Sequence, residues 1–180
     1  MRNPSEAVNQ HMKQLGIICI AIIGYQVGYG EPGRQLSAHF FERAIGLRIA
    51  EDPHDPELYH LQGDYFHNRK NYAGAIEAYE ASLALAPRSP QVLNNLAWLY
   101  ATCENDNLKD PIRALALARE AAALETAPHI LDTLAESYYV NGQIEEAIAA
   151  EHRALDLATE NRGYYEGQLE KFRRGEKESD

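Results

Sequence analysis

The 180-residue sequence predicts an all-α fold, a right-handed solenoid of about three stacked helical hairpins. One pattern predicts the first helix of each hairpin: a bulky residue, a tiny residue four positions later and an aromatic residue three positions further, as in Leu93, Ala97 and Tyr100. The pattern occurs three times, with 34 and then 38 residues between successive copies. An alanine-rich helical stretch follows each copy. One hairpin cannot bury its apolar face alone, so the hairpins are expected to stack.

The core of the predicted solenoid consists of the tiny, aromatic and bulky residues that recur at these spacings. Tiny residues allow two crossing helices to approach closely, and bulky residues fill the space beside them. The expected core residues are Tyr59, Gly63, Phe66, Ala75, Tyr79, Leu93, Ala97, Tyr100, Ala114, Leu131, Ala135, Tyr138, Ala147 and Ala154.

The repeated pattern resembles the tetratricopeptide repeat family. The resemblance covers about residues 56–159, in three units: 56–89, 90–127 and 128–159. It implies a helix, a short turn and a second helix in each unit. The middle unit has five additional residues within 103–111, which predict a longer polar turn. We expect Asp110 to cap the helix that begins at Pro111.

A further amphipathic helix is predicted on each side of the three units. Residues 35–52 carry apolar side chains at three- and four-residue spacing, and we interpret them as a half-repeat that covers the N-terminal end of the solenoid. Residues 160–175 are predicted to form a C-terminal capping helix, because a terminal repeat needs a cover with a polar outer face.

The N-terminal part begins with a polar tail, residues 1–14, and continues with an apolar stretch, residues 15–30. Residues 14–30 contain no charged side chain. As a helix, these seventeen residues would span roughly 25 Å, close to the roughly 30 Å hydrocarbon core of a membrane. We therefore expect a single-pass membrane anchor, with the repeat units on the extracytoplasmic side. Two alternatives stay open: a cleaved signal peptide, which would give a secreted or periplasmic protein, and a helix packed on the solenoid.

Composition and motifs argue against several classes of function. The formal net charge is −10, and the sequence lacks the basic footprint that nucleic acid binding requires. The two cysteines show no metal-binding spacing, and no nucleophile, phosphate-binding or zinc-protease motif occurs. His60, Asp64 and His67 are the best metal candidates, but the two histidines would lie roughly 10 Å apart along a helix. We therefore expect no catalytic residue, no metal and no cofactor.

The resemblance implies a concave groove, lined by the first helix of each unit, that holds a segment of a partner protein. Helical spacing independently places His60, Asp64 and Trp98 away from the core face of their helices. By position, the groove residues would be Glu57, His60, Asp64, His67, Asn68, Gln91, Asn94, Trp98, Thr102, His129, Asp132, Glu136 and Tyr139.

Trp98 is the strongest candidate for a partner anchor, because it lies on the non-core face of the central unit. The predicted groove has carboxylates and no Lys or Arg, which favours a basic or amide-rich segment over an acidic one. The sequence therefore predicts a membrane-tethered, non-catalytic adaptor that binds another protein. The alternatives are a structural subunit of a membrane complex, packed through its apolar helix, and, less favoured, a metal-dependent accessory enzyme.

Overall fold

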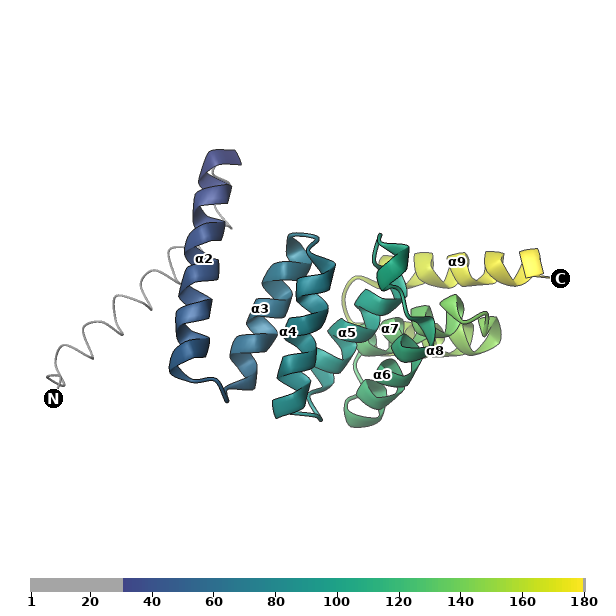
Figure 1. Cartoon of the computed structure of the whole chain (residues 1–180). Coiled ribbons are helices and arrows are strands. Elements are labelled where there is room, and N and C mark those ends of the chain that lie inside the picture. Colours follow the sequence, from purple (N-terminus) through teal and green to yellow (C-terminus); the bar gives the residue numbers. More distant parts are fainter. Residues whose placement is uncertain (1–30, 180) are drawn as a thin grey trace, which may run out of the picture. The chain divides into compact units, whose positions relative to one another are not determined.

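The computed structural model describes residues 31–179, which form helices joined by turns (Figure 1). The predicted tail and apolar stretch, residues 1–30, lie outside the described residues. Within residues 31–179, no helix is both long enough and apolar enough to cross a membrane. The anchor expected in residues 15–30 therefore stays a prediction.

The described residues contain α-helices and one short 3₁₀ helix, and among them there is no strand. The predicted all-α fold is confirmed. In chain order the elements are α2 (Glu31–Glu51), α3 (Pro56–Asn68), α4 (Tyr72–Leu85), α5 (Pro90–Thr102), η1 (Asp106–Leu108), α6 (Pro111–Leu124), α7 (Pro128–Val140), α8 (Ile144–Leu157) and α9 (Arg162–Ser179).

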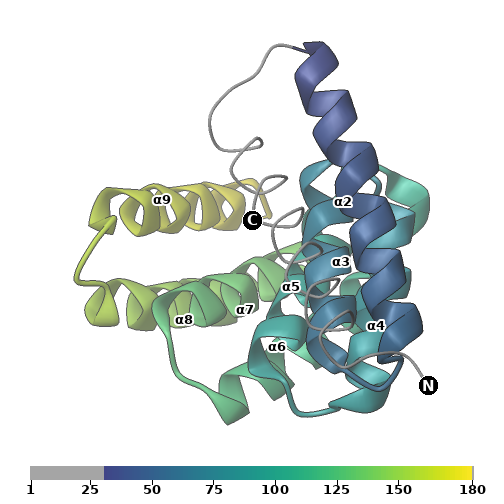
Figure 2. The ribbon, with the colours of Figure 1, turned by 90° about the vertical axis from the view of Figure 1, so that its left-hand side faces the viewer.

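Three helical hairpins follow one another along the chain: α3 with α4, α5 with α6, and α7 with α8 (Figure 1). The first helices of the last two hairpins, α5 and α7, contact each other, and α6 also contacts α7. Helix α9 packs against α8 at the C-terminal end (Figure 2). Each hairpin thus buries its apolar face against the next one, as the repeat requires.

Local sequence determines where the helices of the repeats begin. Pro90, Pro111 and Pro128 are the first residues of α5, α6 and α7. Proline suits this position because its missing N–H would have no partner within the helix. Asp110 Oδ1 accepts a hydrogen bond from the backbone N–H of Arg113 at 3.0 Å, so the predicted cap of α6 is confirmed.

The tight turns of the first and third hairpins have the same backbone geometry with different residues. Gly142 in the third turn has φ 73°, in the left-handed region that glycine adopts without steric cost. The equivalent residue of the first turn is Lys70, with φ 58°. In the third turn the N–H of Gln143 donates to the Tyr138 carbonyl at 3.0 Å. In the first turn the N–H of Asn71 donates to the Phe66 carbonyl at 2.9 Å. The backbone hydrogen bonds therefore fix this turn even where glycine is absent.

The residues expected in the core of the repeats are mostly buried. The exceptions are three aromatic residues at the ends of the first helices, Tyr59, Phe66 and Tyr138, which are half-buried. Ala97 and Ala135 have no exposed surface, as close helix crossings require. One apolar cluster extends from Ala97 on α5 to Phe172 on α9, so the last two hairpins and the C-terminal helix share a core.

The terminal helices extend beyond the predicted boundaries. Helix α2 begins at Glu31 and not at residue 35, because Pro32 falls in its first turn, where proline removes no intrahelical bond. Helix α2 belongs to a separate compact unit that ends at Leu58, and Phe41 and Ile45 of α2 are buried. Helix α9 continues to Ser179, beyond the predicted end at residue 175.

Candidate partner-binding groove

A groove of about 370 Å³ lies in the second compact unit, residues 59–180. Its walls come from the first helices of the hairpins, α3, α5 and α7, and from α9. Its lining residues are Asp64, His67, Asn68, Asn94, Asn95, Trp98, His129, Asp132, Thr133 and Tyr164. We refer to this set as the groove.

The sequence-predicted residues divide between the groove and its surroundings. Those that line it are Asp64, His67, Asn68, Asn94, Trp98, His129 and Asp132. Those that do not are Glu57, His60, Gln91, Thr102, Glu136 and Tyr139. The structure adds three lining residues that the sequence did not predict: Asn95, Thr133 and Tyr164.

Several of the predicted residues outside the lining support residues within it. Nε2 of His60 lies 3.5 Å from Oδ2 of Asp64. Gln91 Oε1 lies 3.4 Å from Nε2 of His129. Glu57 belongs to the other compact unit, residues 1–58. Fewer of the predicted residues therefore line the groove than the sequence suggested.

Asp64 connects the first hairpin with α5. Its Oδ1 accepts hydrogen bonds from the Tyr79 hydroxyl at 2.7 Å and from Asn95 Nδ2 at 3.0 Å. Burial, together with this bond to Asp64, raises the pKa of Tyr79 above its ordinary value. The Asp64 side chain nevertheless stays 41% exposed, so its negative charge faces the groove. Burial lowers the pKa of His67, which lines the same wall, and favours its neutral form.

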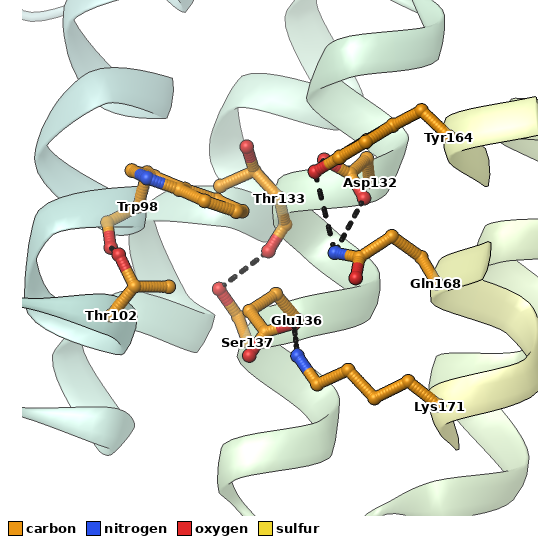
Figure 3. A network of polar contacts seen from close by, with 9 residues as sticks. All are labelled: Trp98, Thr102, Asp132, Thr133, Glu136, Ser137, Tyr164, Gln168 and Lys171. Carbon is orange, nitrogen blue, oxygen red and sulfur yellow. Dashed lines mark hydrogen bonds and ion pairs between the residues drawn. The ribbon is translucent and has the colours of Figure 1, made fainter. Parts of the chain in front are cut away.

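Helix α9 supplies hydrogen-bond donors to the two acidic residues of α7 (Figure 3). The Tyr164 hydroxyl donates to Asp132 Oδ2 at 3.0 Å, and Gln168 Nε2 approaches Asp132 Oδ1 at 3.4 Å. Lys171 forms an ion pair with Glu136. Asp132 and Glu136 keep only 6% and 5% of their surface exposed, so α9 covers most of both side chains.

This packing corrects the sequence-based view of the third unit. Glu136 and Tyr139 were expected on an open groove face, but both contact α9. Glu136 pairs with Lys171, and the centroids of the Tyr139 and Phe172 rings lie 5.0 Å apart. The lining residues contain no Lys or Arg. However, the acidic character of the groove is smaller than expected, since Lys171 compensates one of the predicted carboxylates.

The residues that the sequence missed left only weak signals. Tyr164, Gln168 and Lys171 recur at positions i, i+4 and i+7, a polar stripe along one face of α9. The stripe is visible in the sequence, but the helix that it meets is not. Asn95 and Thr133 directly follow predicted groove residues, and their contribution depends on how closely α3, α5 and α7 pack.

The residues of α5 at the groove have unused binding capacity. Trp98 is half-buried, and among residues 40–175 no side chain stacks on its ring or accepts from its indole N–H. The Thr102 hydroxyl donates to the backbone carbonyl of Trp98 at 2.8 Å and supports the helix end. Asn94 is only 7% exposed, and its Oδ1 has no hydrogen-bond partner among the described residues. Figure 3 shows Trp98 across from Asp132 and Tyr164.

A metal site is not assembled in the part of the chain that the structure describes. Within it, no group of three or more His, Cys, Asp or Glu side chains is placed to hold a metal ion. His60, Asp64 and His67 do not form such a group, so the geometry gives no support to the metal-dependent alternative.

Residues 56–89 match the family model of the tetratricopeptide repeat. This match covers the first hairpin, and two further hairpins of the same helix–turn–helix form follow it along the chain. The fold is a tetratricopeptide repeat (TPR) solenoid. No curated protein sequence matches the chain.

Solved structures of TPR proteins are similar to this chain in fold. The first TPR domain of Spaghetti (RPAP3), bound to an HSP90 peptide, is 21% identical with a TM-score of 0.59, over 67% of this chain and 91% of that one. MamA from Desulfovibrio magneticus RS-1 is 17% identical with a TM-score of 0.66, over 93% and 97%. Yeast Tom70 is 16% identical with a TM-score of 0.71, over 92% of this chain and 33% of its own. At these identities the likeness concerns the TPR fold alone.

Proposed function

We propose that this TPR protein is a non-catalytic adaptor that holds a segment of another protein in the groove. The proposal is carried by two neighbouring groups on α5. Among the described residues, the Trp98 ring has no stacking partner and the buried Asn94 carbonyl has no donor. Binding anchors are typically aromatic side chains in pockets that become fully desolvated in the complex. TPR proteins generally act as interaction scaffolds, which agrees with this role.

The chemistry of the groove favours a basic or amide-rich segment. Asp64 and Asp132 contribute negative charge, and none of the lining residues is Lys or Arg. The TPR domain of Spaghetti is bound to the HSP90 peptide SRMEEVD, which has three acidic side chains and one basic side chain. The negative charge of this groove would repel an acidic segment, so we expect a basic or amide-rich ligand.

Trp98→Ala is expected to weaken the binding of such a segment about tenfold or more, because it removes the largest contact surface of the groove. Peptides selected from a random library against the full chain would be titrated against wild type and variant. Circular dichroism should show unchanged helicity. Ile112→Ala is the matched control, since Ile112 is 79% exposed and lies outside the groove. Selected peptides that bind Trp98→Ala as tightly as wild type, or a selection that enriches nothing, would contradict the proposal.

We further propose that residues 15–30 tether the adaptor to a membrane, with the TPR domain on the extracytoplasmic side. The absence of charged residues from 14 to 30 supports the tether. Membrane fractionation combined with intact-mass analysis tests it. Full-length protein that resists extraction by salt and alkali is the expected result. A soluble product that begins near residue 31 would indicate a cleaved signal peptide instead, and a soluble full-length chain would indicate a packed helix.

A further inference from the structure

Asn94 is the least satisfied polar side chain along the groove. It is 7% exposed, and its Oδ1 receives no hydrogen bond from any residue that the structure describes. The adjacent Asn95, in contrast, donates to Asp64 at 3.0 Å. A buried carbonyl without a donor destabilises the folded state, and such exceptions are typical of functional sites. The Oδ1 atom is covered in this structure, and a ligand in the groove reaches it once the amide turns about its terminal torsion, which is broad in asparagine.

The surroundings of Asn94 combine negative charge with an aromatic face. Trp98 lies four residues further along α5 and therefore on the same side of the helix. Asp64 on α3 and Asp132 on α7 line the groove on the two flanking helices. The Asp64 carboxylate remains 41% exposed. A ligand group in this place meets the indole ring and the exposed Asp64 carboxylate, with the mostly covered Asp132 on the other flank and the Asn94 amide below.

From this combination we infer that the groove binds an arginine side chain of the partner segment. The guanidinium lies over the Trp98 ring, donates an N–H to Asn94 Oδ1 and carries its charge between Asp64 and Asp132. The inference rests on the proposed function and adds the chemistry of the ligand to it.

Arginine fits these groups better than the other basic or amide side chains. Its guanidinium is flat, stacks on aromatic rings and donates in its own plane at the same time. It is also more weakly hydrated than an ammonium group, so it gives up less water on entering a groove whose acceptor is buried. Lysine provides the charge without the flat face, and an amide provides donors without the charge.

A series of short peptides tests the inference directly. Blocked alanine peptides with a central arginine, citrulline, lysine or glutamate would be titrated against the full chain. The fluorescence of Trp98 reports on the groove, because the chain contains one tryptophan. We expect saturable binding of the arginine peptide and roughly tenfold weaker binding of the citrulline peptide, which has the same shape without the charge. Equal affinity for the two peptides, or no saturable binding of the arginine peptide, would overturn the inference.

Asn94→Leu tests the role of the carbonyl. We expect the variant to bind the arginine peptide about tenfold more weakly than wild type. Its thermal stability should be unchanged or higher, because leucine has a similar shape and leaves no unsatisfied group. Asn107→Leu, an asparagine replacement in the exposed turn, should bind as wild type. If Asn94→Leu does not fold, Asn94→Ala serves the same purpose. Retained arginine affinity in a folded variant at this position would exclude Asn94 as the acceptor.

The failure of this inference is distinguishable from the failure of the proposed function. Library peptides that need Trp98 but tolerate exchange of every arginine for citrulline would leave the adaptor function intact and show that the groove does not select arginine. Library peptides that ignore Trp98 would contradict the adaptor function itself, whatever the defined peptides do.

Discussion

Glu151→Gln is expected to stabilise the folded protein at pH 8, by on the order of 3 kcal/mol. Glu151 on α8 has no exposed surface, and neither of its carboxyl oxygens meets a donor among the described residues. Burial and then the neighbouring Asp132 raise its pKa from 4.5 to about 8. Ionisation therefore places an unpaired charge in the core, which a neutral glutamine avoids.

The repeat itself explains why a carboxyl group occupies this position. Glu151 stands where the first unit has Tyr79, since each follows the tiny residue of its own unit, Ala135 or Gly63, by sixteen positions. Tyr79 donates its hydroxyl proton to Asp64. Asp132 takes the corresponding place beside Glu151 and contributes to its raised pKa. A protonated carboxyl group or the amide of glutamine has a proton to donate there, whereas a carboxylate has none. The neutral acid thus takes the place of the tyrosine hydroxyl.

The pH dependence follows from the direction of this shift. The unfolded chain releases the proton near pH 4.5, whereas the folded protein keeps it until about pH 8. The contribution of Glu151 to stability is therefore complete below pH 4.5 and is lost as the pH rises to 8. Urea unfolding of wild type and Glu151→Gln between pH 5 and 8 measures the difference, with the exposed Glu120→Gln as control. Parallel stability profiles for wild type and Glu151→Gln would show that Glu151 does not titrate in this range.

Gly63→Ala is expected to destabilise the first hairpin by about 1–3 kcal/mol, although alanine is the better helix former. A Cβ atom at this position would lie 2.5 Å from Cε1 and 3.0 Å from Cγ of Tyr79. The Tyr79 ring cannot move away easily, because it is fully buried and its hydroxyl is bonded to Asp64. The added methyl group must therefore shift the ring, the hydrogen bond or α4.

Two comparisons separate overpacking from a general effect of glycine replacement. Gly167 on α9 has no atom within 4 Å of an added Cβ, so Gly167→Ala should raise stability by roughly 0.5–1 kcal/mol. In the background of Tyr79→Leu, the replacement of Gly63 should cost less, because the ring is gone. Thermal and urea unfolding of wild type, Gly63→Ala, Tyr79→Leu and the double variant give the coupling energy between the two positions. Equal costs in both backgrounds would mean that Tyr79 is not the obstacle.

Glu151 and Gly63 show which features of the fold the sequence predicts and which it does not. The spacing of tiny and bulky residues predicted the hairpins and most of their buried residues, and the Asp-Pro pair at 110–111 predicted the cap of α6. These features depend on helical periodicity and on contacts within a few residues, which a sequence displays directly. The choice of glycine in the first unit and alanine in the next two is also written there. The reason for this choice is the size of the residue that faces the tiny position: Tyr79 in the first unit and the small Ala118 in the second. That reason becomes known only when the structure shows which side chains meet.

The candidate site was predictable in part. The sequence by itself determined that a polar face without a core partner runs along the first helices, with Trp98 at its centre. Only the tertiary structure decided that α9 covers Glu136, that Glu151 lies buried beside Asp132, and that no donor within residues 31–179 reaches the Asn94 carbonyl. The physical reason is that burial and hydrogen-bond satisfaction are joint properties of helices tens of residues apart, and no residue carries them in its own sequence neighbourhood.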